Sequence, residues 1–138
     1  MAADTLAFID AVVSVDGKDL SPDGTNVTLD YNAEALEDTA FGDTTKSRIG
    51  GLKDWSGTLE FNQDFGSTPA PDVDLFGFVG TVVAIALKAT SSSTSATNPD
   101  YQGQALITNY KPFGQGVGEL GKAQVTFEAA GNLSRVTS

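Results

Sequence analysis

The sequence predicts a mainly β fold, a β-sandwich or open barrel with one short flanking α-helix. Three segments (26–32, 54–62 and 122–128) alternate apolar and polar residues with the period of two that half-buried strands show. Chain-reversal signals separate the apolar segments, first at Asp16-Gly17 and then at Ser21-Pro22-Asp23-Gly24. Alternating strands with tight turns between them are typical of antiparallel sheets.

The first strands follow from these patterns in order. Residues 5–15 are continuously apolar, which predicts a strand covered on both faces. Segments 26–32 and 54–62 each predict a strand with one apolar and one polar face. The residues predicted to face the core are Val27, Leu29 and Tyr31 in the first of these, and Trp55, Leu59 and Phe61 in the second.

A short helix is predicted at 71–79. Pro71 suits the first helical turn, and the acids that follow it complement the helix dipole. The residues expected to face inward are Val73, Phe76 and Phe78. A second continuously apolar strand, covered on both faces, is predicted at 81–89.

The last third of the chain adds a loop and two strands. Residues 90–99 (TSSSTSATNP) are a polar, low-complexity segment and predict an exposed Ser/Thr-rich surface loop. Residues 104–110 predict a strand that ends at Lys111-Pro112. Segment 122–128 predicts a strand whose apolar face is formed by Ala123, Val125 and Phe127.

Composition limits the function. At 138 residues the chain has the size of one domain, spanning 1–138, and is long enough to bury a real core. It contains neither cysteine nor histidine. Disulfides, thiolate metal sites, a cysteine nucleophile, a histidine base and the commonest zinc ligands are therefore excluded. We expect a binding or structural role that needs no cofactor.

The charge is negative and unevenly distributed. The net charge is −10, and residues 1–45 hold ten acids against one lysine. Three of the eight basic residues, Lys46, Arg48 and Lys53, lie within eight positions of one another. Binding nucleic acid requires cations that replace released counterions, so a surface that grips DNA is not expected.

The chain shows no pattern of a membrane protein or of a signal peptide. The N-terminus lacks a basic region and carries Asp4 and Asp10 within its apolar stretch. The longest apolar run, 82–87, is too short to span a bilayer. We therefore expect no membrane partner.

Two local patterns have a plain and a functional interpretation. Residues 116–121 match GxGxxG by letter, but a strand pattern follows where the nucleotide fingerprint needs a helix, which favours a flexible loop. Several acids cluster in turns, and solvated turn acids are the favoured interpretation, with Ca²⁺ binding left open. These acids are Asp16, Asp19, Asp23, Asp72 and Asp74. A carboxylate pair for glycoside hydrolysis also stays open.

Segment 33–52 is long for a connection in a compact domain. It carries acids in its first part and bases further on, a pattern suited to pairing with its own copy. It also holds apolar residues that need a partner, namely Leu36, Phe41, Ile49 and Leu52. A long loop with both charge signs and apolar anchors predicts an extended interaction segment.

The run EDTAFGDTTKSRIGGLKDWSGTLEF, residues 37–61, resembles the T-x-F-G-D…K…G-L-K-D-x-S run of the major tail (tail tube) proteins of long, non-contractile-tailed bacteriophages. The order of the predicted strands and helix is also similar over most of the chain. The matching positions are Thr39, Phe41, Gly42, Asp43, Lys46, Leu52, Lys53 and Asp54. This chain departs from the family at Gly50, where a proline is common, and is therefore less rigid at that turn.

The resemblance implies a β-sandwich of tail tube type that assembles as stacked, hexameric rings. One sheet of each subunit would join its neighbours in a continuous barrel around a lumen, and the long loop would reach another copy. The resemblance implies these loop residues as inter-subunit contacts: Thr39, Phe41, Gly42, Asp43, Lys46, Arg48, Ile49, Leu52 and Lys53. The polar strand faces suit a water-filled channel and supply these lumen candidates: Thr28, Asp30, Thr58, Glu60, Gln124 and Glu128.

The resulting expectation is a structural virion protein without catalytic activity. An acidic lumen would let DNA pass during ejection without binding it specifically. The resemblance implies a tape measure protein in the lumen and tail-completion or baseplate proteins at the tube ends. It places the chain in the virion tail, and in the host cytoplasm during assembly. The alternatives are a monomeric Ig-like β-sandwich that serves as a binding or decoration module, and a hydrolase that uses acidic residues.

Overall fold

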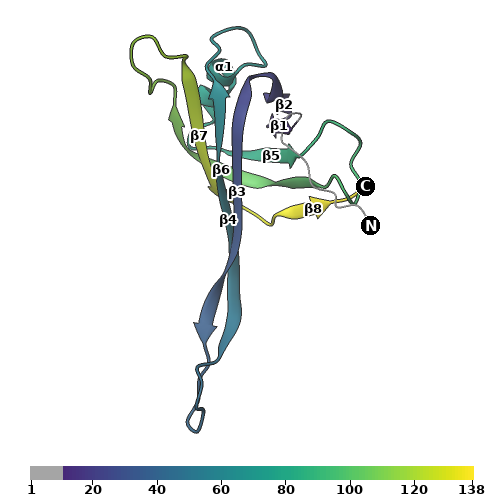
Figure 1. Ribbon diagram of the computed structural model, residues 1–138, viewed down its shortest axis with the longest axis vertical. Helices are drawn as coiled ribbons and strands as arrows, with labels where there is room; N and C mark the ends of the chain where they lie inside the picture. The colour runs from purple at the N-terminus through teal and green to yellow at the C-terminus, as the bar shows by residue number, and fades with distance from the viewer. Residues whose placement is uncertain (1–10) are drawn as a thin grey trace.

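A computed structural model describes residues 11–138 of the chain (Figure 1). Strands dominate and the helices are single turns, which confirms the predicted mainly β class with one short α-helix. The elements in chain order are β1 (Val12–Val15), β2 (Lys18–Asp19), the 3-10 helix η1 (Ser21–Asp23), β3 (Gly24–Glu37), β4 (Arg48–Asn62), α1 (Pro71–Leu75), the 3-10 helix η2 (Phe76–Phe78), β5 (Val82–Lys88), β6 (Asp100–Lys111), β7 (Lys122–Ala129) and β8 (Ser134–Val136).

The eight described strands form one antiparallel sheet that bends over on itself. Its order is β2-β1-β5-β6-β7-β4-β3, and β8 pairs with β6. The first half of β6 pairs with β5 and its second half with β7, with a register shift between Ile107 and Asn109. A shift of this kind bends a strand, so β6 carries the sheet from one layer to the other. In Figure 1, β5, β6 and β8 accordingly cross β3, β4 and β7.

The core lies between these layers and contains the residues that alternation assigned to it on two of the three strands. Trp55, Leu59 and Phe61 of β4 are buried, as are the three apolar residues of β7. The indole N–H of Trp55 donates a 2.8 Å hydrogen bond to the carbonyl of Gly131. Burial of these aromatic and aliphatic side chains is the main source of the fold's stability.

The prediction that 81–89 is covered on both faces is wrong. Along β5 only Val83, Ile85 and Leu87 are buried, and Val82 is 54% exposed. The sheet covers one face of this strand, and a short apolar run cannot by itself distinguish one covered face from two. The first predicted strand also alternates along β1, and its residues 5–10 lie outside the described part of the chain.

The predicted helix is shorter and rotated. α1 makes a single turn and passes into η2, so Val73 and Phe76 are exposed and Leu75 is the buried apolar residue. The prediction that Val73 and Phe76 face inward is therefore wrong, whereas Phe78 is half-buried against the core. The reason is Asp74, which turns inward and accepts hydrogen bonds from Thr68 Oγ1 and from the backbone N–H of Ala70.

Half of segment 33–52 is strand rather than loop. β3 continues to Glu37 and β4 starts at Arg48, so only residues 38–47 connect them. Ala33 pairs with Lys53, and we call the ribbon from this pair outward, residues 33–53, the arm. The arm leaves the body of the protein along its long axis and has no second layer beside it within residues 11–138 (Figure 1). Both strands of the arm are exposed over most of their length.

The Ser/Thr-rich segment 90–99 connects β5 to β6 and is ordered by one side chain. Asn98 is buried, and its amide donates to the carbonyl of Ser92 at 2.9 Å and accepts from the N–H of Thr90 at 3.3 Å. After β7 the chain adds β8, which pairs with the start of β6 and which the sequence did not predict.

Candidate assembly surfaces

The tip of the arm is built by its own hydrogen bonds. The N–H of Ala40 donates to Asp43 Oδ2 at 2.7 Å, and the N–H of Asp43 donates back to the carbonyl of Ala40. Thr39 Oγ1 accepts from the N–H of Ser47 at 2.8 Å. Gly42 has a φ of +93°, which favours glycine. Three of the predicted contact residues, Thr39, Gly42 and Asp43, therefore shape the turn itself.

The arm exposes apolar side chains that a soluble monomer would ordinarily bury. Phe41, at the turn, has a relative exposure of 109%, and Leu52 one of 77%. Leu36 and Ile49 are cross-strand partners and are also exposed. An elongated segment with this much uncovered apolar surface is typical of an interaction site.

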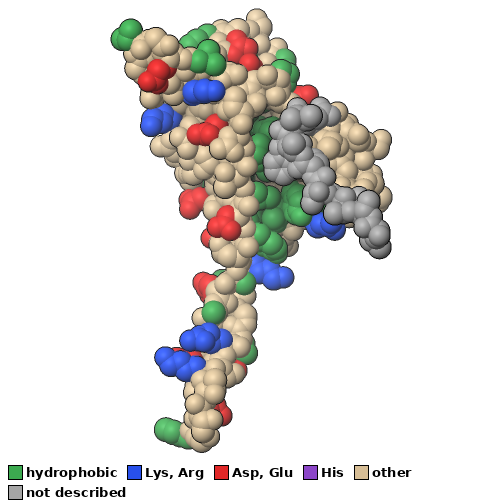
Figure 2. Space-filling model, viewed as in Figure 1, with side chains coloured by type: hydrophobic (Ala, Val, Ile, Leu, Met, Phe, Trp, Pro, Cys, Tyr) green, Lys and Arg blue, Asp and Glu red, His purple; other side chains and the backbone are tan. Residues whose placement is uncertain are grey.

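The three clustered basic residues all lie on the arm. Lys46, Arg48 and Lys53 are exposed, and none of them forms an ion pair within residues 11–138. Acidic residues also lie on the arm, and Glu37 is the cross-strand partner of Arg48. The arm thus offers both charge signs together with apolar side chains, as the sequence indicated (Figure 2).

The six lumen candidates lie in three cross-strand rows on one polar face of β3, β4 and β7. Each row has one residue from each strand and contains two candidates. The rows are Asn26–Glu60–Gln124, Thr28–Thr58–Thr126 and Asp30–Ser56–Glu128. The register thus places together residues that are 98 positions apart in the sequence, such as Asp30 and Glu128.

The same polar face also carries cations that the sequence analysis did not include. Lys111 on β6 pairs with Gln124, and Lys122 on β7 pairs with Asn62. The ammonium of Lys122 donates to Asn62 Oδ1 at 2.8 Å. The face therefore holds two lysines beside its carboxylates: alternation along 122–128 already places Lys122 there, whereas Lys111 is placed there by the pairing of β6 with β7. Its acidic character is weaker than the sequence suggested.

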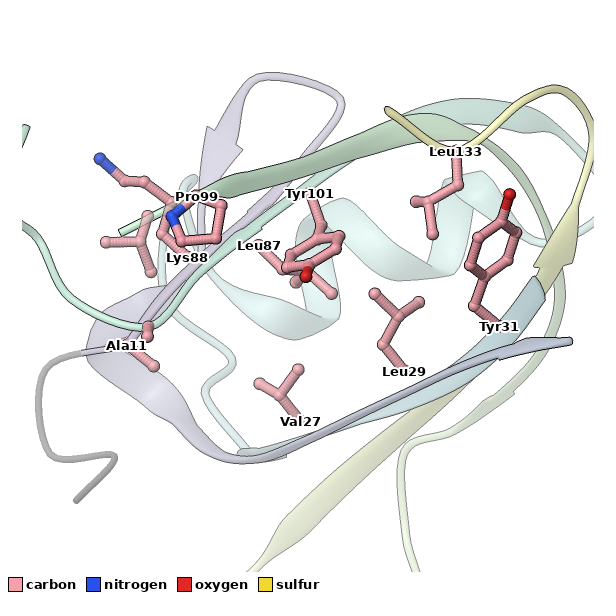
Figure 3. A pocket seen from close by; sticks show the side chains of 11 residues that line it. Ala11, Val27, Leu29, Tyr31, Leu87, Lys88, Pro99, Tyr101 and Leu133 are labelled. Carbon is pink, nitrogen blue, oxygen red and sulfur yellow. The ribbon is translucent and has the colours of Figure 1, made fainter. Parts of the chain in front are cut away.

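A groove opens between β3 and the layer formed by β5 and β6 (Figure 3). It has a volume of about 490 Å³ and a largely apolar lining. Val27, Leu29 and Tyr31 point into it, and Tyr31 is 52% exposed. Val27 and Leu29 are half-buried and pack against the core, as predicted. The prediction is wrong for Tyr31, which is exposed because no element within residues 11–138 covers this edge of the sandwich. The opposite wall contains Leu87, Tyr101 and Leu133.

A polar network joins the helix to the sheet. The hydroxyl of Tyr110 donates to Asp72 Oδ1 at 3.0 Å and accepts from Gln63 Nε2 at 3.1 Å. Burial, partly offset by the hydrogen bond from Gln63, raises the pKa of Tyr110 to about 12, so the phenol stays protonated. Asp72 and Asp74 are therefore structural hydrogen-bond acceptors, and the interpretation of both as solvated turn acids is wrong.

The structure also bears on the glycine-rich stretch, on metal binding and on membrane-spanning helices. Residues 116–121 form an exposed loop that leads into β7, so the interpretation of this glycine-rich stretch as a loop is confirmed. Within residues 11–138 no group of three or more acidic side chains is arranged to hold a metal ion. No helix in the same range is long and apolar enough to cross a membrane.

Comparison with known proteins shows the fold. No model of a known family matches the chain, and no curated protein matches it in sequence. Solved structures of virus-like tails do match. The tail of an empty gene transfer agent particle with C6 symmetry has a TM-score of 0.65 at 16% identity, and the match covers 83% of this chain and 82% of that chain.

Two further structures agree. A chain in the virion of the native gene transfer agent has a TM-score of 0.71 at 15% identity and covers 96% of this chain and 99% of that chain. The SPP1 tail tube has a TM-score of 0.69 at 16% identity, covering 94% of this chain and 76% of that chain. These matches show that the chain shares the fold of these tail and virion chains. More specifically, it has the tail tube fold, as the resemblance of residues 37–61 implied.

Proposed function

We propose that this chain is a structural subunit that polymerises as stacked rings into a tail tube, with six copies in each ring. The C6 symmetry of the gene transfer agent tail, which shares the fold, supports the ring size. The observation that carries the proposal is the arm, a projecting ribbon with exposed apolar side chains and exposed cations. The role is mechanical, and no catalytic step is part of it.

The arm contacts another copy of the chain. Exposed strands and apolar side chains promote non-specific association in solution. When the same surface of each neighbouring copy covers them, they form a specific interface instead. The contact set is the exposed arm residues, with Phe41, Ile49 and Leu52 as apolar anchors. Lys46, Arg48 and Lys53 add electrostatic complementarity, which serves orientation and association rate more than affinity.

The polar face of β3, β4 and β7 lines the lumen. Its carboxylates Asp30, Glu60 and Glu128 repel phosphate, so DNA passes during ejection without specific binding. Lys111 and Lys122 moderate this repulsion and sit on the same face. The Thr and Gln side chains of the face, Thr28, Thr58 and Gln124, keep it hydrated without adding charge.

The proposed tube also implies the domain organisation, the partner proteins and the location of this chain. Residues 1–138 act as one tail tube domain, in which 33–52 is the interaction segment and 90–99 a surface loop. A tape measure protein occupies the lumen before DNA does, and tail-completion or baseplate proteins close the tube ends. The subunit assembles in the host cytoplasm and ends in the virion tail.

Electron microscopy of the concentrated, purified protein tests the proposal. Rings or tubes with a central hole are the expected result. Particles that stay monomeric at every salt and protein concentration, and also with other tail proteins present, would contradict the tube. They would favour the alternative of a monomeric Ig-like binding or decoration module, for which the apolar groove beside Tyr31 is the supporting feature.

Charge reversal tests the arm. The triple variant Lys46→Glu, Arg48→Glu and Lys53→Glu should not polymerise, while its melting temperature stays unchanged because exposed charges contribute little to folding. The matched control reverses three exposed or half-exposed cations elsewhere, namely Lys18, Lys88 and Arg135. Polymerisation of the arm variant, or its loss in the control as well, would remove the arm charges from the interface.

A second variant tests the lumen. Asp30→Lys, Glu60→Lys and Glu128→Lys together should allow tubes to form, because these side chains lie on the polar face, but should slow DNA passage in an infection assay. The matched control replaces the same three residues by Gln, which removes charge without adding cations. Normal infectivity of the lysine variant would refute the lumen assignment.

A further inference from the structure

The end of the body opposite the arm carries an exposed apolar patch that the sequence analysis did not single out. It consists of Phe65, Phe113, Val117 and Leu120, which we call the end patch. Phe65 is 63% exposed and Phe113 is 73% exposed, and their ring centroids are 6.0 Å apart. Two aromatic rings in contact with each other, and uncovered on their outer side, form a ready surface for a third apolar group.

Hydrogen bonds hold the two loops of the end patch together. Phe65 follows β4, whereas the other three residues lie in the loop between β6 and β7. The N–H of Gln63 donates to the carbonyl of Gly121 at 2.9 Å, and its side-chain amide donates to the carbonyl of Pro112, also at 2.9 Å. These hydrogen bonds hold both ends of the β6–β7 loop beside Phe65 and so fix the position of the loop relative to that residue.

The arm and the end patch lie at opposite ends of the molecule. In Figure 1 the β6–β7 loop stands at the upper end of the long axis and the arm at the lower end. Figure 2 shows hydrophobic side chains at both ends. Two different surfaces that join head to tail generate an open-ended assembly, and a stack along one axis needs them at opposite ends.

The charges near the two surfaces are complementary. Asp64 precedes Phe65, and Asp23 lies close enough that burial and the charge of Asp64 both raise the pKa of Asp23. Glu119 lies in the β6–β7 loop itself. Two cations also lie at this end: Lys122 is hydrogen-bonded to Asn62, and Lys111 is exposed at the end of β6 with its side chain beside Gly114. The three acids Asp23, Asp64 and Glu119 outnumber them. The arm, in contrast, brings Lys46 and Arg48 behind its apolar tip, with no ion pair of their own in the described chain.

We infer that the end patch is the acceptor for the arm of a second copy in the next ring, with Phe41 packed against the Phe65–Phe113 pair. The cations behind the tip then face Asp64 and Glu119. This inference rests on the proposed tube and specifies its stacking contact, which sets the polarity of the stack. The contact buries Phe41, the one aromatic residue of the arm, against two rings that are themselves exposed.

The absence of cysteine from the chain makes a direct test possible. Because both replacements weaken the stacking contact itself, the variant Phe41→Cys with Phe113→Cys is assembled at a protein concentration well above the wild-type threshold and then treated with a mild oxidant. Non-reducing gels should then show a ladder of covalent multimers. A disulfide requires Cβ atoms about 4 Å apart, so only residues in contact will link. The controls are each single cysteine variant and the pair Phe41→Cys with Ser92→Cys, which should give no ladder. Assembled tubes of the Phe41–Phe113 variant without a ladder would overturn the inference.

A truncation experiment supplies a second readout. The variant Phe65→Ser with Phe113→Ser should keep the melting temperature of the wild type, because both side chains are exposed, and should form rings that do not stack. The critical concentration for tubes should rise at least tenfold. Phe41→Ser should have the same effect, and combining all three changes should add little, since one contact is removed only once.

The outcomes separate the two proposals. If the wild-type chain never forms rings or tubes, the proposed function fails. If the wild type forms tubes and the Phe65→Ser, Phe113→Ser variant forms them at the same concentration, the tube stands and the end patch is not its stacking contact.

Discussion

Replacing Trp55 by Phe should destabilise the protein by about 2–3 kcal/mol. Trp55 is buried, packs edge-on against Phe127 at 6.1 Å between ring centroids, and donates to the carbonyl of Gly131. Losing that hydrogen bond costs about 1 kcal/mol, since the exposed Gly131 can bind water instead. The smaller ring leaves roughly 40 Å³ empty, which adds about 1 kcal/mol for the cavity and a similar amount for lost apolar burial.

A second substitution beside the indole ring, at Gly103, serves as a control in a double-mutant cycle. A Cβ on Gly103 would lie 2.6 Å from Trp55 Cζ2, so Gly103→Ala should be costly in the wild type. In the Trp55→Phe background the same methyl group enters the vacated space, and its cost should fall by at least about 1 kcal/mol. Urea unfolding followed by circular dichroism measures all four proteins. A Trp55→Phe cost below about 0.5 kcal/mol, or no coupling to Gly103, would refute this account of the core.

Three further changes test local features of the fold. Asp74→Ala leaves Thr68 Oγ1 and the N–H of Ala70 without their acceptor, and should lower the free energy of unfolding by about 1–3 kcal/mol in urea; an unchanged value would contradict this. Asp23 has a raised folded pKa, so its ionisation removes stability as pH rises through that pKa. Asp23→Asn should therefore melt higher than wild type at neutral pH and equally at about pH 3, and the reverse order would be inconsistent with repulsion by Asp64. Gly57→Ala should unfold the protein or sharply lower its melting temperature, because the new Cβ would lie 2.1 Å from the carbonyl oxygen of Thr28, whereas Gly50→Ala meets nothing within 4 Å and should melt normally.

The strands of the body were predictable because one of their faces is buried. Within residues 54–62 of β4 and 122–128 of β7 the apolar residues fall at alternating positions, and each of them lies in the core. The same alternation separated the polar face that now forms three cross-strand rows. Strand pairing was not predictable in this way, since register depends on contacts between distant segments. Lys111 therefore joined the polar face only once β6 was seen beside β7.

The sequence pattern also did not determine which apolar faces other elements of the fold would bury. Val27, Leu29 and Tyr31 alternate as regularly as the core residues of β4, yet they line a groove and Tyr31 is exposed, because no other element within residues 11–138 covers that edge of the bent sheet. The inward face of α1 was predicted wrongly for a similar reason, the burial of Asp74. A buried carboxylate that accepts two hydrogen bonds fixes the rotation of α1, and helical periodicity carries no information about such a partner.

The arm shows why a segment with real strand structure lacked a strand signal. From Ala33–Lys53 to Ala35–Gly50 the pairing advances two residues on β3 and three on β4, so β4 has a bulge there and the alternation of the body is interrupted. Both faces of the arm are exposed, so nothing inside the subunit selects apolar residues at every second position. In the proposed tube the arm contacts another copy, so the pattern of Leu36, Phe41, Ile49 and Leu52 records an interface between subunits.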